Sequence, residues 1–232
     1  MEILTIDIGN SSVKFGFFKD GRNCEPEVFE YNEIEGIPSI EAEIVVYSAV
    51  SSVKKAEVIK KVKGDKIEEI NPERINSLKF EYNPLSSLGK DRIAAGLGAF
   101  KIYGGNSLIV DFGTAITVDY IDDRGVFKGG MIFPGPQSIL DCLKMKTDKV
   151  KVEKYYPYIE LGNSTENSVC SAITNAILGM IERKINGLLP KNLVFTGGYY
   201  SLFKEMFEET KIIEDRWLVL KGLFFYGKER FK

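Results

Sequence analysis

Two stretches of this chain share one pattern, and that pattern constrains the fold more than any other feature. Residues 108–125 read LIVDFGTAITVDYIDDRG, and residues 4–21 read LTIDIGNSSVKFGFFKDG. In both, an apolar run leads into Asp-x-Gly-[Asn/Thr], and a second β-prone run follows and closes on a glycine. The pattern predicts strand, tight turn and strand in each case. Two hairpins of one length favour a duplicated domain. The alternative is a chance likeness between turns, in which Asp and Gly are common.

The first bend of each hairpin has the chemistry of a phosphate site. Gly9 and Gly113 let the backbone approach a ligand closely, and the N–H groups of such a turn form a concavity for anions. The carboxylates of Asp7 and Asp111 would repel bare phosphate, so they imply a bridging cation. The first turn adds hydrogen-bond donors and one positive charge: Asn10, Ser11, Ser12 and Lys14. An ordinary hairpin turn with a solvated lysine is the alternative for this stretch.

The composition is that of a soluble globular protein. The chain has 232 residues, of which 44% are hydrophobic and 28% charged, with a formal net charge of −2. This charge gives no electrostatic case for a nucleic-acid partner or an anionic membrane, and no apolar run has the length of a membrane span. The N-terminus enters a strand without the pattern of a signal peptide. A small or nucleotide-like ligand remains open.

Cysteine and histidine usage narrow the chemistry. Cys24, Cys142 and Cys170 are far apart and odd in number, so they predict neither a disulfide framework nor a metal site, which fits a cytoplasmic protein. The chain contains no histidine. Histidine-based triads and metal sites are therefore excluded, and a general base would most simply be a carboxylate.

The first half of the chain predicts a mixed α/β layer. We expect a hairpin over residues 2–20, strands over 27–31, 43–47 and 66–70, and helices over 52–63 and 92–103, with 76–88 a loop. Ser51 or Ser52 is the expected N-cap of the first helix. The second helix is rich in small residues and should pack closely. Gly104-Gly105 ends it and marks the boundary between an N-terminal half, 1–104, and a C-terminal half, 105–232.

The second half predicts a similar order of elements. After its hairpin we expect a strand over 126–133, a helix over 137–145, a long amphipathic helix capped by Asn163-Ser164-Thr165, a strand over 192–196, and a last helix over 216–230. The predicted fold class is α/β, with two halves that pack around a central cleft.

Four motifs in order carry a resemblance to a known family. They are Asp7-Ile8-Gly9-Asn10, Gly89-Lys90-Asp91-Arg92, Asp111-Phe112-Gly113-Thr114-Ala115 and Gly129-Gly130-Met131-Ile132-Phe133-Pro134-Gly135. The paired halves resemble the actin-like (ribonuclease H-like) ATPase superfamily, in which each half has the order β-β-β-α-β-α-β. Within it, the four motifs resemble those of the type III pantothenate kinases. Tyr82-Asn83-Pro84 and Gly162-Asn163-Ser164-Thr165 are similar to two further segments of that family.

The resemblance implies roles for particular residues. The first motif, Asp7, Ile8, Gly9, Asn10, Ser11, Ser12, Val13 and Lys14, would hold the ATP phosphates, with Mg²⁺ between Asp7 and the phosphates. Asp91 would be the general base, and Gly89, Lys90, Asp91 and Arg92 would bind pantothenate. Independently of the resemblance, a carboxylate beside an arginine suits phosphoryl transfer to an alcohol, and Arg92 can form a bidentate contact with a substrate carboxylate. The alternative makes Asp91 an N-cap of the following helix and Arg92 part of its solvated face.

The resemblance extends to a cation site and to further substrate contacts. Asp111 resembles the residue that binds K⁺ or NH₄⁺, and Thr114 one that touches ATP. Tyr82 and Thr165 resemble two pantothenate contacts, although Thr165 also fits an ordinary helix cap. The glycines of 129–135 and 197–198 would line the adenosine side, or serve only as turns.

The expected activity is therefore ATP-dependent phosphorylation of pantothenate to 4'-phosphopantothenate, the first step of coenzyme A biosynthesis, by a cytoplasmic homodimer. The small-residue helix is a candidate dimer contact, or packs inside one subunit. Lys90 departs from the family, which has a small or apolar residue there, and its charge could lower the pKa of Asp91. The alternatives are another small-molecule kinase of the superfamily and a non-catalytic regulator that retains the fold.

Overall fold

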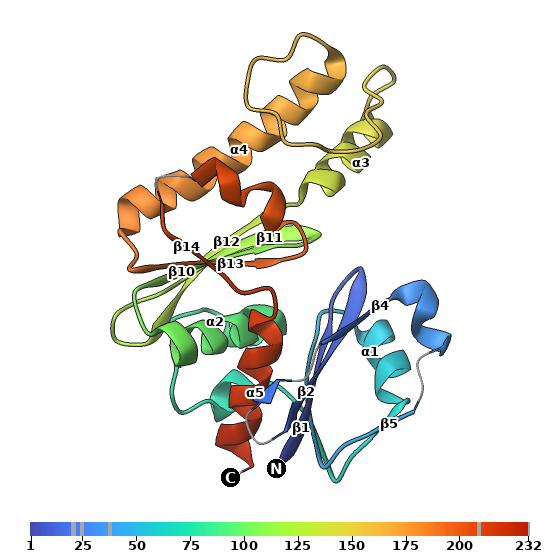
Figure 1. Cartoon of the computed structure of the whole chain (residues 1–232), viewed down its shortest axis with the longest axis vertical. Helices are drawn as coiled ribbons and strands as arrows, with labels where there is room; N and C mark the ends of the chain where they lie inside the picture. Colours follow the sequence, from blue (N-terminus) through green and yellow to red (C-terminus); the bar gives the residue numbers. More distant parts are fainter. Residues whose placement is uncertain (20–21, 24–25, 37–38, 208–209, 232) are drawn as a thin grey trace. The chain divides into compact units, whose positions relative to one another are not determined.

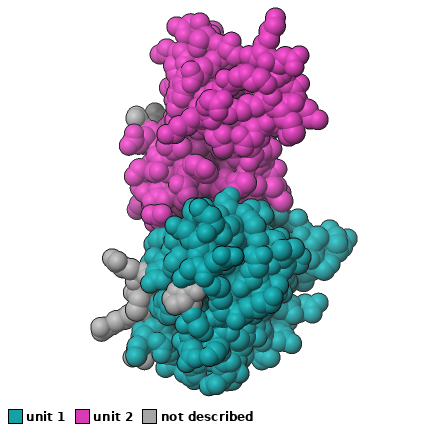
Figure 2. All heavy atoms as spheres, turned by 90° about the vertical axis from the view of Figure 1, so that its right-hand side faces the viewer, with its two compact units in different colours: residues 1–107, 119–129, 217–232 teal, residues 108–118, 130–216 magenta. Residues whose placement is uncertain are grey.

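The computed structural model describes residues 1–19, 22–23, 26–36, 39–207 and 210–231. It is a mixed α/β structure whose strands form two large sheets (Figure 1). The described chain divides into two compact units, shown in teal and magenta in Figure 2. The first unit comprises residues 1–107, 119–129 and 217–232, and the second comprises 108–118 and 130–216. None of the described helices combines the length and the hydropathy that crossing a bilayer requires.

The first sheet is built on the first predicted hairpin. Strand β1 (Glu2–Ile8) pairs antiparallel with β2 (Ser12–Lys19) and parallel with β6 (Ile44–Ala49), in the order β3-β2-β1-β6-β8. The flanking strands are β3 (Arg22–Asn23), β4 (Glu27–Glu30), which also pairs with β2, and β8 (Lys66–Glu69). Six consecutive residues of β1 are buried because helices cover both faces of this sheet. The parallel strands β1, β6 and β8 therefore end at one edge, where Asp7 and Ser48 stand.

The second sheet contains the second predicted hairpin. Its order is β14-β13-β10-β11-β12-β9, and the hairpin strands are β10 (Ser107–Phe112) and β11 (Ala115–Ile121). The others are β12 (Val126–Pro134), β13 (Asn192–Gly197), β14 (Ile212–Glu214) and β9 (Lys79–Phe80). In the second unit, α3 (Pro136–Lys146) and α4 (Thr165–Leu188) pack against one another.

Glycines bring two helices of the first unit into close contact. Helix α2 (Lys90–Tyr103) and helix α5 (Leu218–Arg230) lie side by side (Figure 1). A methyl group on Gly222 would stand 1.8 Å from the carbonyl oxygen of Ala94, and one on Gly98 would stand 2.7 Å from that of Leu218. The small residues of α2 are thus used for packing inside the chain, and their alternative role as a dimer contact stays a prediction.

Most predicted elements are confirmed, with differences at their boundaries. Helix α1 (Ser52–Ile59), capped by Ser51, stops before the predicted end at Lys63, because residues 62–63 form strand β7 (Val62–Lys63), which pairs with β5 (Ile40–Glu41). The predicted loop 76–88 contains the short strand β9. Residues 20 and 21, at the end of the first hairpin, lie outside the described residues. Helix α5 belongs to the first compact unit, and the boundary at 104/105 between duplicated halves stays a prediction.

We expect Gly222→Ala to destabilise the protein by at least about 2 kcal/mol, because the new methyl group forces α5 away from α2. Gly179→Ala is the matched control, since this glycine is also helical and a methyl group there would meet no atom within 4 Å. The control should be neutral or slightly stabilising, by up to about 1 kcal/mol. Urea unfolding of both variants measures the difference, and equal midpoints would contradict the packing described for Gly222.

Candidate active site

Asp7 stands at the carboxyl end of β1, held by its two neighbouring strands. Its Oδ1 accepts a hydrogen bond of 2.9 Å from the Ser48 hydroxyl on β6, and its Oδ2 lies 3.1 Å from Lys14 Nζ on β2. The strand register dictates both contacts, because Asp7 pairs with Lys14 on one side and with Ser48 on the other. The side chain is only 5% exposed, so its orientation is fixed before any ligand binds.

The turn that follows Asp7 presents backbone and polar groups. The N–H of Gly9 donates to the carbonyl of Ser12 over 3.1 Å, which closes the turn, and Asn10 and Ser11 are exposed. Ile8 and Val13 have fully buried side chains. These two predicted contacts could therefore reach a nucleotide only through their backbone groups.

Asp91 lies in the first turn of α2. The N-cap of this helix is Gly89, which carries no side-chain cap, so the alternative prediction that Asp91 is the N-cap is wrong. Instead, Oδ1 of Asp91 accepts a 2.8 Å hydrogen bond from the N–H of Arg92. Burial, and next the negative charge of Asp7, raise the pKa of Asp91, while Arg92 opposes the rise. The structure thus brings Asp7 and Asp91 into one electrostatic environment within the first unit.

Arg92 forms an ion pair with Asp119, a residue that was not predicted to belong to the site. Its Nε lies 3.0 Å from Oδ2 of Asp119 and its Nη2 lies 2.5 Å from Oδ1, a two-pronged contact. The two side chains are 5% and 3% exposed, so the prediction that Arg92 lies on a solvated helix face is wrong. Burial raises the pKa of Asp119 to about 6 although Arg92 opposes it, so the carboxylate is still mostly ionised at neutral pH. Burial disfavours the Arg92 charge, but hydrogen bonds to Asp119 hold its pKa above the ordinary value.

Tyr82 joins this cluster through the remaining end of the guanidinium. Nη1 of Arg92 lies 3.4 Å from the Tyr82 hydroxyl, and the guanidinium carbon lies 5.5 Å from the ring centre. Phe127 borders both groups, at 6.0 Å from the same carbon. A methyl group on Gly129 would stand 3.6 Å from the Tyr82 ring, so this glycine of the fourth motif faces Tyr82 in the first unit. The prediction that this motif's glycines line the adenosine side or serve as turns does not include this approach to Tyr82, and it stays a prediction.

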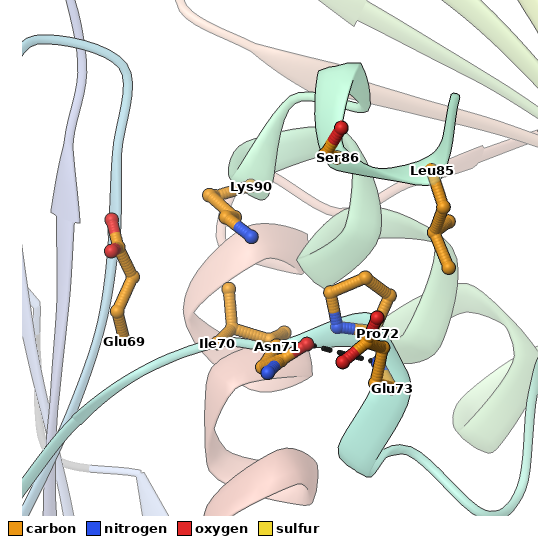
Figure 3. A pocket seen from close by; sticks show the side chains of 8 residues that line it. All are labelled: Glu69, Ile70, Asn71, Pro72, Glu73, Leu85, Ser86 and Lys90. Carbon is orange, nitrogen blue, oxygen red and sulfur yellow. Dashed lines mark hydrogen bonds between the residues drawn. The ribbon is translucent and has the colours of Figure 1, made fainter. Parts of the chain in front are cut away.

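Lys90, the residue before Asp91 in the chain, points into a pocket of about 300 Å³ (Figure 3). The walls come from the segment after β8 and from the loop after Tyr82, and the lining residues are Glu69, Ile70, Asn71, Pro72, Glu73, Leu85, Ser86 and Lys90. Glu69 is paired with Lys55 at 2.7 Å. Lys90 has no carboxylate within 4 Å among the described residues, although it stands in the first turn of a helix, where a positive charge is unfavourable.

The second unit holds the other predicted residues around the turn between β10 and β11. Asp111 Oδ1 lies against Gly197, where an added methyl group would stand 2.4 Å from it, and Gly197 has a φ of +93°. The N–H of Gly135 and the hydroxyl of Ser138 both donate to the Thr114 carbonyl, at 2.9 Å each. The glycines of the later motifs thus permit close backbone approach to this second turn, with the Thr114 side chain exposed.

Thr165 is the first residue of α4, and its side chain is exposed. The cap is Ser164, whose hydroxyl accepts from the N–H of Asn167 over 3.1 Å. The alternative prediction, that Thr165 serves as a helix cap, is therefore wrong. Its hydroxyl is not used for capping.

The carboxylates of the site suit a Mg²⁺ ion that is held mainly by the phosphates of the nucleotide. Among the described residues, no three carboxylates or thiols gather into a cage for a metal ion. Mg²⁺ in kinases is commonly held by one or two carboxylates together with substrate phosphates and water. Asp7 fits that requirement, because each of its oxygens keeps a lone pair beyond its contact with Ser48 or Lys14.

The arrangement defines a class. The first turn is polar, and it follows a parallel strand that ends in a buried carboxylate, Asp7. This arrangement is typical of an ATP-dependent phosphotransferase with an actin-like fold. The model of the type III pantothenate kinase family matches residues 3–187. The chain therefore belongs to the type III pantothenate kinases, which phosphorylate pantothenate in coenzyme A biosynthesis.

Relatives of similar length support this assignment. The type III pantothenate kinase of Persephonella marina is 31% identical over 96% of this chain and 96% of its own length. That of Cytophaga hutchinsonii is 32% identical over 89% and 90%, and that of Sulfurihydrogenibium sp. is 28% identical over 97% and 99%.

Solved structures show the same fold at low identity. A Campylobacter jejuni protein named for the Baf family of transcriptional activators is 23% identical, with a TM-score of 0.69, covering 97% of this chain and 98% of that one. The activator of 2-hydroxyisocaproyl-CoA dehydratase from Clostridium difficile, solved with bound ADPNP, is 13% identical, with a TM-score of 0.53, covering 99% and 96%.

We expect Asp119→Ala to cost about 3–5 kcal/mol of stability, because it leaves the buried Arg92 without its partner. The double variant Arg92→Met/Asp119→Leu removes both charges and should recover most of that loss. Urea unfolding of the two variants and the wild type measures this. A single variant as stable as the wild type would contradict the pairing.

Proposed function

We propose that Asp91 is the general base that accepts the proton of the pantothenate hydroxyl while the γ-phosphate of ATP is transferred to it. The observation that carries this assignment is the position of Asp91, partly buried beside the phosphate-type turn and within the field of Asp7. A base must be ionised yet basic enough to take a proton, and the raised pKa moves Asp91 in that direction. With no histidine in the chain, Asp91 is the carboxylate best placed for the role.

The acceptor is held by groups around Asp91. Gly89 leaves the backbone open before the helix, and the Tyr82 hydroxyl and the outer nitrogen of Arg92 form one polar wall. Because Asp119 already offsets the charge of Arg92, a substrate carboxylate would find little net attraction there. Lys90 supplies the additional positive charge, and its pocket has room for the acidic end of pantothenate. Thr165, whose side chain is exposed, is kept as a proposed pantothenate contact on the resemblance of its motif alone.

The donor is held by the first turn and its carboxylate. The backbone N–H groups after Gly9 and the side chains of Asn10, Ser11 and Ser12 bind phosphate oxygens, and Lys14 offsets charge. Mg²⁺, held by Asp7 through water, supplies charge neutralisation of the phosphates when it is bound. Thr114, in the second turn, is kept as a proposed ATP contact on the resemblance of its motif alone.

The second carboxylate serves a monovalent cation. Asp111 stands at the same place of its hairpin as Asp7, and its Oδ1 lies against Gly197. A K⁺ or NH₄⁺ ion there would offset repulsion between Asp111 and phosphate.

The free thiols Cys142 and Cys170 fit a cytoplasmic setting, and Cys24 lies outside the described residues. The enzyme acts as a homodimer.

The two alternative functions, a non-catalytic regulator and another small-molecule kinase, require different residues at this site. A regulator without activity would not need Asp91 beside a phosphate turn, and its presence favours catalysis. Another small-molecule kinase would share both turns but not the Tyr82–Arg92 cluster next to Lys90. We therefore favour pantothenate as the acceptor.

The test is ATP-dependent phosphorylation of pantothenate in K⁺ and in Na⁺ buffers. We expect turnover in K⁺, a loss of at least about a hundredfold in kcat for Asp91→Asn, because general-base catalysis contributes that much, and a loss of K⁺ activation in Asp111→Asn. Asp65→Asn, at an exposed aspartate, is the matched control. Activity only on another alcohol would overturn the acceptor, and full activity of Asp91→Asn would overturn the base.

Lys90 is tested with a neutral substrate. We expect Lys90→Met to raise the KM for pantothenate about tenfold, as expected for losing a hydrogen bond to a charged group, and to leave the KM for an uncharged pantothenate amide unchanged. Stability should not fall, because the lysine stands at a helix N-terminus. Equal effects on the acid and the amide would mean that Lys90 does not contact the carboxylate.

A further inference from the structure

Two side chains outside every predicted motif hold the backbone of the first turn from one side. The Tyr31 hydroxyl, in η1 (Tyr31–Gly36), donates to the carbonyl of Gly9 over 2.6 Å. Lys54 Nζ, in the first turn of α1, donates to the carbonyl of Asn10. These two groups also touch each other, because Lys54 Nζ lies 3.7 Å from the centre of the Tyr31 ring.

The two contacts to the carbonyls also determine the direction of the N–H groups that follow them. In a planar trans peptide the carbonyl of one residue and the N–H of the next point in opposite directions. The bond to Gly9 therefore directs the N–H of Asn10 away from Tyr31, and the bond to Asn10 directs the N–H of Ser11 away from Lys54. Since Tyr31 and Lys54 are in contact, both carbonyls face one side, and both N–H groups face the other.

Successive N–H groups that face one side in this way can form a concavity that attracts anions. We infer that Tyr31 and Lys54 are positioning residues for the donor site: they hold the first turn in the conformation whose N–H groups bind the phosphates of ATP. The inference rests on the proposed function in one respect, that the first turn holds phosphate. Neither residue needs to contact the nucleotide, and both act through the carbonyls that they bind.

The contacts are suited to this task. The Tyr31 ring is partly buried, and burial, followed by the charge of Asp7, raises the pKa of its hydroxyl to about 12, so it remains a hydrogen-bond donor at neutral pH. The ammonium of Lys54 adds a charge-assisted bond and a cation–π contact, each stronger than its neutral counterpart. Without them, the turn would retain the bond from Gly9 N–H to Ser12 but lose the two side-chain contacts to the carbonyls of Gly9 and Asn10.

The test is the affinity for MgATP of Tyr31→Phe and Lys54→Met, measured by calorimetry without acceptor. We expect the Kd to rise about three- to tenfold in each variant, which corresponds to the loss of one such hydrogen bond. The double variant should show less than the product of the two effects, because both act on one turn. In steady state, the KM for ATP should rise while the KM for pantothenate stays constant.

Lys61→Met is the matched control. Lys61 Nζ also donates to a backbone carbonyl of η1, that of Glu35 over 2.6 Å, but this bond does not touch the first turn. The control should leave the Kd for MgATP unchanged. An unchanged Kd in Tyr31→Phe and Lys54→Met overturns the inference, and so does an equal rise in Lys61→Met or in the KM for pantothenate, since either indicates general structural support. Wild-type protein that binds MgATP but does not phosphorylate pantothenate would overturn the proposed acceptor and leave this test intact.

Discussion

The buried pair of Arg92 and Asp119 is the interaction on which the acceptor side of the site depends. It ties the first turn of α2 to strand β11, and therefore fixes where Asp91 stands at the start of that helix. A buried ion pair contributes little net stability, but breaking it is costly, so it restrains geometry more than it adds to the free energy of unfolding. It also offsets the charge of Arg92, which is the reason for proposing Lys90 as the contact to an acidic substrate.

The sequence predicted the elements that follow a clear period and the residues that lie in turns. Both hairpins, the long helix and the first motif were found because apolar runs and turn residues are local signals. Asp119 was missed because its partner stands 27 residues away and a carboxylate within an alternating strand reads as solvent-facing. Strand β9 was missed because two residues carry no period, and only their pairing with β12 defines it. Tyr31 and Lys54 were missed because their role is carried by backbone carbonyls.

The carboxylates of the two hairpin turns, Asp7 and Asp111, are contacted by different kinds of groups. In the first unit, strand register places a lysine and a serine on the carboxylate of Asp7, and side chains from η1 and α1 hold the following peptides. In the second unit, glycine and backbone groups surround Asp111 and Thr114. The first turn therefore has a lysine paired with its carboxylate. The roles of Asp7 with Mg²⁺ and of Asp111 with a monovalent ion remain the proposals made above.

The most direct test of the account is the pH dependence of kcat at saturating ATP and pantothenate. Asp91 acts as a base only when ionised, and burial and the charge of Asp7 raise its pKa, so activity should be lost as the pH falls through a value above the ordinary aspartate pKa of about 3.9. A kcat that stays constant down to about pH 4 in folded protein would contradict the claim that Asp91 takes the proton.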